Sequence, residues 1–127
     1  MQDRHLFEYA VIRVVPRVER EEFINVGVIL YCAKRKFLKS VFAFDEGRLA
    51  AFSTKLDPEA VRTNIESIGV ICSGGKASGP IGQLDLPSRF RWLTATRSTV
   101  IQASKVHPGF CVDPDETLLR LCKEFVL

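Results

Sequence analysis

The chain has 127 residues, a length that suits one domain whose core needs no disulfide or metal to hold it. It carries 18 basic and 15 acidic residues, and the resulting charge of +3 is too mild to indicate a dedicated nucleic-acid binder. No stretch reaches the roughly 18 apolar residues of a membrane span, and the first residues lack the apolar run of a secretory signal. We therefore expect a single domain over residues 1–127 in a reducing cytoplasm, away from the membrane.

Three strands are predicted in the first third of the chain. Apolar and β-branched residues alternate over residues 9–15, and Pro16 ends this run because proline has no main-chain donor. Residues 23–33 form the second strand, and residues 37–44 form the third after a Lys-Arg-Lys turn. One apolar stripe of the second strand is taken as the main core face: Ile24, Val26, Val28, Leu30 and Cys32.

The rest of the chain predicts helices and a fourth strand. In chain order we expect a helix from Asp57, a surface loop over 73–80, a short helix over 86–95, a strand over 100–104, a turn over 107–109 and a helix from Asp113. This order predicts an α+β fold with a three- to four-stranded, mainly antiparallel sheet and helices packed on it. Because the third strand is apolar on both faces, the sheet must be covered on both sides or pair with a second subunit.

The chain contains several distinctive short motifs: Tyr9-x-Val-Ile-Arg13-x-Val-Pro16, Glu22-Phe-x-Asn25-Val-Gly27-Val, Gly82-Gln83, Arg89-Phe-x-Trp92-Leu-Thr and Arg97-Ser98-Thr-Val-Ile-Gln102. Together they resemble a bacterial family of short proteins, domain of unknown function family 3037. The resemblance runs from about Tyr9 to Val126 and brings no activity, cofactor or catalytic residue with it. It implies an accessory role beside a HipA-like kinase in a bacterial stress or defence system.

Two polar positions stand among apolar neighbours in the predicted sheet. Arg13 shares a strand face with Tyr9 and is expected to meet Asn25 or Glu22 on the next strand. The simpler interpretation is a cross-strand pair, and the functional one is a clamp for an anion or carboxylate. Asn25 either satisfies a main-chain group at a bulge or, with Gly27, forms a floor that a partner approaches closely. The candidate partner-binding residues are Arg13, Glu22, Asn25, Gly27, Trp92, Arg97 and Ser98.

Basic residues near one tryptophan give an alternative. Bases stack on aromatic rings and phosphates bind arginines, although such residues more often form a solvated surface beside one buried ring. The nucleic-acid interpretation uses Lys34, Arg35, Lys36, Arg89, Arg91 and Arg97.

Signatures of catalysis are scarce. The chain has no phosphate-binding, dinucleotide-binding or nucleophile-elbow motif. Its four cysteines lack metal-ligand spacing and are expected to be small buried residues. A metal-dependent nuclease using Glu22, Asp45 and Glu46, or another small hydrolase, stays open. We expect no catalytic residue, metal or cofactor, and a non-catalytic module that binds a partner protein, or a second copy, through its sheet.

Overall fold

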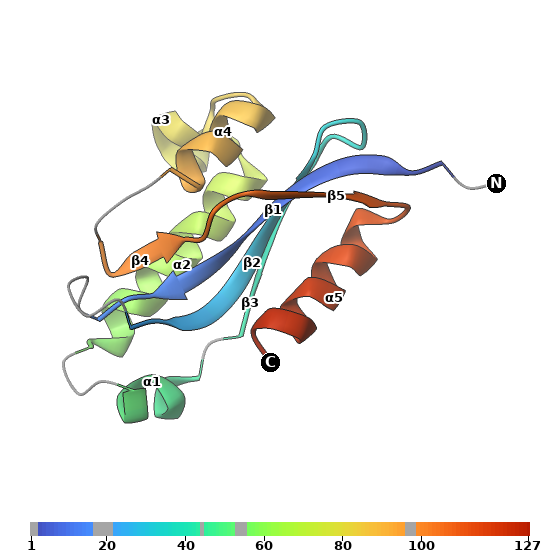
Figure 1. Cartoon of the computed structure of the whole chain (residues 1–127). Coiled ribbons are helices and arrows are strands. Elements are labelled where there is room, and N and C mark those ends of the chain that lie inside the picture. Colours follow the sequence, from blue (N-terminus) through green and yellow to red (C-terminus); the bar gives the residue numbers. More distant parts are fainter. Residues whose placement is uncertain (1–2, 17–21, 44, 53–55, 96–98) are drawn as a thin grey trace.

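The computed structural model describes residues 3–16, 22–43, 45–52, 56–95 and 99–127. Its centre is one antiparallel sheet of five strands, in which β1 is paired with β2 along one edge and with β4 and β5 along the other (Figure 1). The strands are β1 (His5–Val14), β2 (Ile24–Cys32), β3 (Phe37–Phe42), β4 (Ile101–Ala103) and β5 (His107–Cys111). The predicted α+β fold is confirmed, with one more strand than expected.

Helices cover both faces of the sheet, α2 and α4 on one side and α5 on the other (Figure 1). The helical segments are α1 (Glu46–Phe52), α2 (Pro58–Ser73), the 3-10 turn η2 (Lys76–Ser78), α3 (Gly79–Gly82), α4 (Leu86–Leu93) and α5 (Pro114–Phe125). The chain therefore buries both apolar faces with its own helices, and neither face by itself requires a second subunit.

Capping aspartates fix where the three longer helices begin. Asp57, Asp85 and Asp113 each accept a hydrogen bond from a main-chain N–H in the first turn of α2, α4 and α5, respectively. A proline stands within two residues of each cap, where its missing N–H costs no helical hydrogen bond. The helix starts predicted at Asp57 and Asp113 are confirmed.

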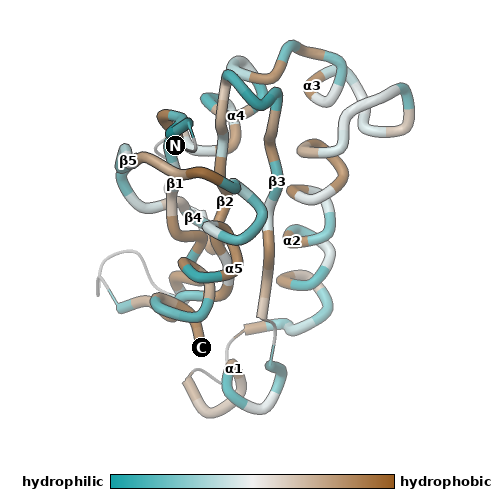
Figure 2. The backbone as a smooth tube through the Cα atoms, turned by 90° about the vertical axis from the view of Figure 1, so that its right-hand side faces the viewer, coloured by the Kyte–Doolittle hydropathy of each residue, from teal (hydrophilic) through white to brown (hydrophobic). Residues whose placement is uncertain are grey.

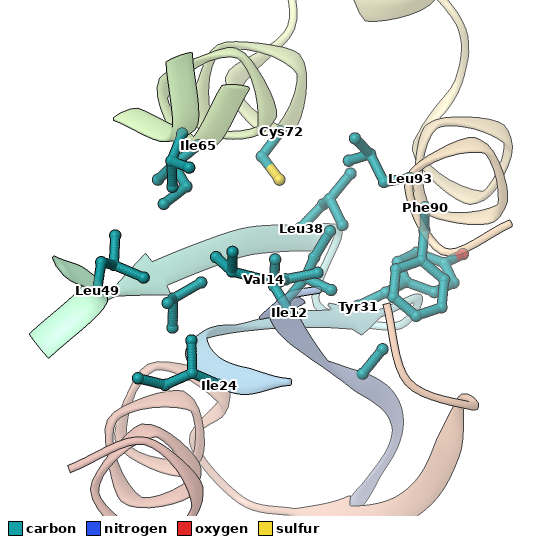
Figure 3. Close-up of a cluster of buried hydrophobic side chains, with 14 residues drawn as sticks. Ile12, Val14, Ile24, Tyr31, Leu38, Leu49, Ile65, Cys72, Phe90 and Leu93 are labelled. Atoms are coloured by element: carbon teal, nitrogen blue, oxygen red, sulfur yellow. The ribbon is translucent and has the colours of Figure 1, made fainter. Parts of the chain in front are cut away.

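Two apolar clusters lie on the two faces of the sheet. On one side Ile12 and Val14 of β1 pack with Ile65 of α2 and with Phe90 of α4 (Figure 3). On the other side Phe7, Val28 and Leu30 pack with Leu118 and Leu121 of α5. Burying a side chain of this size stabilises a fold by about 1.5–3 kcal/mol, so these clusters hold both helical layers to the sheet.

A β-bulge at Val26 overturns the predicted core stripe of β2. Ile12 is opposite Gly27 and Arg13 is opposite Asn25, so Val26 is an extra residue without a partner. Beyond an extra residue the alternation of faces reverses. Ile24 and Val26 therefore face α2 and α4, whereas Val28, Leu30 and Cys32 face α5.

Residues 107–109 form the start of β5, and the predicted turn is wrong. Pro108 is opposite Glu8 on an edge strand, where proline is tolerated because no described strand lies beyond β5 to accept a hydrogen bond from its main chain. Gly109 lies so close to Phe7 that a Cβ atom there would be 2.6 Å from the ring. Proline is therefore accommodated because the strand is at an edge, and glycine because Phe7 packs closely against it. Neither residue makes the chain turn here.

Three short helical segments, α1, η2 and α3, were not predicted from the sequence. The segment 73–80, predicted as a surface loop, contains η2 and the beginning of α3. After the third strand, Glu46 begins α1, which buries Leu49 in the core. All three pieces are too short to be recognised from helical periodicity.

The four cysteines are buried free thiols, as expected for small apolar residues. Burial raises the pKa of Cys72 to about 11, which keeps that thiol protonated at neutral pH. Among the residues described, no group of three or more His, Cys, Asp or Glu side chains is placed to hold a metal ion. Within the same ranges, none of the helices combines the length and apolar character needed to cross a membrane.

Candidate functional site

Arg13 and Asn25 are direct partners across β1 and β2, so the predicted pairing of these positions is confirmed. The Arg13 guanidinium carbon lies 3.9 Å from the centre of the Phe23 ring, in the range of a cation–π contact. Its Nε atom is buried and has no hydrogen-bond partner among the described residues, and burial lowers the pKa of this side chain. In the described part of the chain, the neighbour of this charge is an aromatic ring and not a carboxylate.

The Asn25 amide is used to close a helix. Its Nδ2 atom donates to the carbonyl oxygen of Phe125 at 3.1 Å, in the last turn of α5. Helix ends leave carbonyl groups without an internal partner, and a side-chain donor satisfies one of them. The Oδ1 atom of Asn25 is buried and makes no hydrogen bond within the described ranges. Asn25 therefore joins β2 to α5 rather than offering its donor to a partner.

Gly27 lies on the opposite face of the sheet from Asn25, so the predicted patch is split by the bulge. Its open side is filled by Phe42, because a Cβ atom at Gly27 would be 2.3 Å from that ring. The proposed binding floor is therefore a packing contact inside the protein. Glu22 is exposed where the chain leads into β2. Arg97 and Ser98 lie outside the described residues.

We expect Asn25→Ala to lower the free energy of unfolding by about 1 kcal/mol, because it removes the hydrogen bond to Phe125. Urea unfolding followed by circular dichroism measures this loss. Asn64→Ala is the matched control, since Asn64 is exposed on α2 and its substitution should cost less than about 0.5 kcal/mol. Equal effects of the two substitutions would show that Asn25 does not hold α5.

The arginines of the nucleic-acid hypothesis have separate structural uses. Arg89 is buried and donates to the carbonyl oxygens of Ile71, Cys72 and Leu84, so it cannot bind a phosphate. Placing it in an exposed basic cluster is wrong. Buried carbonyl groups at the end of α2 need a donor, and the guanidinium provides several in one plane.

The other basic residues are only partly available. Arg91 makes two hydrogen bonds, of 2.8 and 2.9 Å, to the Glu8 carboxylate. Arg35 donates to the carbonyl oxygen of Val112 at 3.3 Å, while Lys34 and Lys36 are exposed beside it in the turn between β2 and β3. The structure therefore brings together a small basic turn, and not the continuous basic face of a nucleic-acid binder.

A hollow beside β4 includes one of the predicted residues, Trp92, and is called here the edge groove. It has a volume of about 410 Å³, and its lining is mostly apolar. One wall is a flank of α2 (Asn64, Ser67, Ile68 and Ile71), and the other is the end of α4 (Trp92 and Leu93) with Ala95 just after it. The floor is Ile12 with residues 99–103. Trp92 is 40% exposed, so the rim of the groove presents a large aromatic surface to solvent.

The floor of the edge groove ends at an open strand edge. Ser104 N donates to the carbonyl oxygen of Val11 at 2.8 Å. This bond shows which residues of β4 direct their main-chain N–H and C=O groups toward β1. In an antiparallel pair such bonded residues alternate with residues whose main-chain groups point away. The N–H groups of Ile101 and Ala103 therefore point outward, and no described strand lies beyond β4. The Ile101 carbonyl accepts a hydrogen bond from the Thr99 hydroxyl.

Comparison with known families gives a match over nearly the whole chain. Residues 9–126 match the family described as "Protein of unknown function (DUF3037)". The chain belongs to this family. No curated protein and no solved structure matches the chain.

The part shared with DUF3037 contains the whole edge groove as well as the Arg13–Asn25 pair. Of the groove residues, Trp92 alone was a candidate from sequence. Ile68 and Ile71 carried a weak signal, because they widen the apolar stripe of α2 beyond the buried positions Val61, Ile65 and Cys72. Both residues pack partly against the core and stay partly exposed, and they also line the α2 wall of the groove.

Proposed function

We propose that this DUF3037 protein is a non-catalytic interaction module that binds an extended segment of a partner protein in the edge groove. The single observation that carries the proposal is the position of an apolar groove directly beside an open strand edge. An extended segment added to an open edge gains main-chain hydrogen bonds, and its alternate side chains enter a neighbouring pocket.

The lining of the edge groove suits apolar side chains. Ile68, Ile71 and Ile101 provide the apolar surface, and Trp92 stands half-exposed at the rim. Asn64 and Ser67 add polar groups along the α2 wall that can orient a segment. Partly exposed tryptophans beside apolar pockets are frequent hot spots of protein interfaces.

This proposal moves the binding surface from the sheet face to the sheet edge. Arg13, Asn25 and Gly27 make contacts within the protein, and in this proposal they support the module while the edge groove binds the partner. A HipA-like kinase, the partner that the family resemblance implies, is the first protein to examine. An accessory role in a bacterial stress or defence system belongs to the same proposal.

The test begins with linear peptides selected from a random displayed library and measured by isothermal titration calorimetry. We expect Trp92→Ala to weaken their binding by about 2 kcal/mol, or roughly thirtyfold. Val70→Ser is the matched control, because Val70 is an exposed apolar residue of α2 outside the edge groove. Selected peptides that bind both variants equally would place the interface elsewhere.

Amide hydrogen exchange decides whether the ligand adds to β4. We expect the N–H groups of Ile101 and Ala103 to become protected when a selected peptide binds, because they face the open edge. A peptide that occupies the groove but leaves both amides unprotected would contradict strand addition. If the protein alone forms a dimer that Trp92→Ala dissociates, the occupant is a second copy.

A further inference from the structure

A second hollow lies at the far end of β1 and shares no residue with the edge groove. It has a volume of about 330 Å³ and is called here the basic hollow; it is lined by Arg4, Leu6, Phe7, Glu8, Tyr31, Ala33, Lys34 and Phe110. Leu6 and Phe110 are direct partners across β1 and β5, so their side chains lie side by side on the same face. They are 54% and 67% exposed, which makes them the main uncovered apolar contact in this part of the sheet.

Leu6 and Phe110 are exposed because they lie beyond the part of the sheet that α4 covers. Arg91 of α4 reaches β1 at Glu8, and Tyr31, opposite Glu8, stacks on Phe90. Leu6 lies two residues beyond that contact. Neighbouring exposed apolar residues with a polar rim mark interaction surfaces more often than chance.

The rim of the basic hollow has an excess of positive charge. Arg4 and Lys34 line it, and Lys36 follows in the exposed turn between β2 and β3, which is strongly hydrophilic in Figure 2. The one carboxylate in the lining, Glu8, is already paired with Arg91 through two hydrogen bonds. The field over the apolar floor is therefore positive and favours an acidic occupant.

We propose that the basic hollow binds an acidic segment of a partner protein that carries apolar side chains. Its apolar residues pack on Leu6 and Phe110, and its carboxylates lie near Arg4 and Lys34. Single-stranded nucleic acid is disfavoured, because its bases need successive aromatic rings, and here one exposed ring stands beside a leucine. The inference goes beyond the edge groove: with two docking surfaces, the module can bridge two segments.

The experiment uses the full chain and a fluorescein-labelled peptide in which Asp and Glu alternate with Leu and Phe. We expect fluorescence anisotropy to show binding at least about tenfold tighter than for the same peptide with Lys at every acidic position. Affinity should fall as salt is raised, because the charges are exposed. Phe110→Ser and Lys34→Glu should each weaken binding about tenfold or more.

Two control variants separate this site from others. Leu119→Ser changes an apolar residue that is 60% exposed on α5, and Trp92→Ala changes the edge groove, so both should leave the affinity of the acidic peptide unchanged. Equal binding of the acidic and the Lys peptides, or full affinity in Phe110→Ser, would overturn the proposal. Tighter binding of a labelled oligothymidine at the same residues would also overturn it, in favour of nucleic acid.

Discussion

Replacing Arg89 with methionine is expected to lower the free energy of unfolding by about 3–4 kcal/mol. The Arg89 side chain is only 9% exposed, and it donates to three main-chain carbonyl oxygens at 2.8–3.0 Å. Two of these carbonyls, on Ile71 and Cys72, belong to the last turns of α2, where helix carbonyls have no internal partner. Methionine keeps much of the apolar stem and provides no donor, so it leaves buried acceptors unsatisfied.

The positive charge of Arg89 increases the stabilisation that its hydrogen bonds to the carbonyl oxygens provide. A positive group at a helix C-terminus interacts favourably with the helix dipole, and hydrogen bonds from an ionised donor are stronger than neutral ones. The loss is a large share of the 5–15 kcal/mol typical of a domain, so the variant should melt far below the wild type.

Arg91→Met is the control, because it makes the same substitution two residues away on the same helix. Arg91 is exposed and its pair with Glu8 is screened by solvent, so we expect a loss below about 1 kcal/mol. Urea unfolding of both variants, followed by tryptophan fluorescence and circular dichroism, gives the comparison. Equal losses would show that the carbonyls at the end of α2 do not depend on Arg89.

Local signals in the sequence were sufficient for most elements. A capping aspartate with a nearby proline located the starts of α2 and α5. Alternation and runs of apolar residues located β1 to β3, and β4 lies within the short strand predicted over 100–104. The failures came from features that depend on distant residues. The strand at 107–111 exists because β1 extends far enough to pair with it, and its own Pro108-Gly109 favours a turn. Neighbouring strands can thus override local propensity.

The candidate site was less predictable than the fold, because distant segments form it. The edge groove combines the flank of α2, the end of α4 and β4, and no local pattern relates these segments. The predicted patch failed at one residue: the bulge at Val26 turns Gly27 away from Asn25. Strict alternation cannot show such an insertion, although Gly27 itself indicated one. Arg89 was misplaced because sequence alone does not reveal which arginine a helix end needs.

Gly27 provides the second large effect: Gly27→Ala is expected to lower the free energy of unfolding by about 2–3 kcal/mol. The added Cβ would be 2.3 Å from the Phe42 ring and 2.7 Å from the carbonyl oxygen of Val41. The ring can move, but the carbonyl belongs to the paired strand β3 and cannot retreat without weakening the ladder. Space, and not backbone conformation, is therefore the reason for glycine here.

The same substitution at Gly69 of α2 should have the opposite sign. A Cβ there meets no atom closer than 4.0 Å, and alanine favours a helix interior over glycine by about 0.5–1 kcal/mol. A double-mutant cycle with Phe42→Ala separates the two contacts. Removing the ring relieves one of them, whereas the carbonyl of Val41 stays in place, so Gly27→Ala should cost less than in the wild type but still about 1 kcal/mol or more. A cost that stays the same in both backgrounds would mean that Phe42 does not require glycine at position 27.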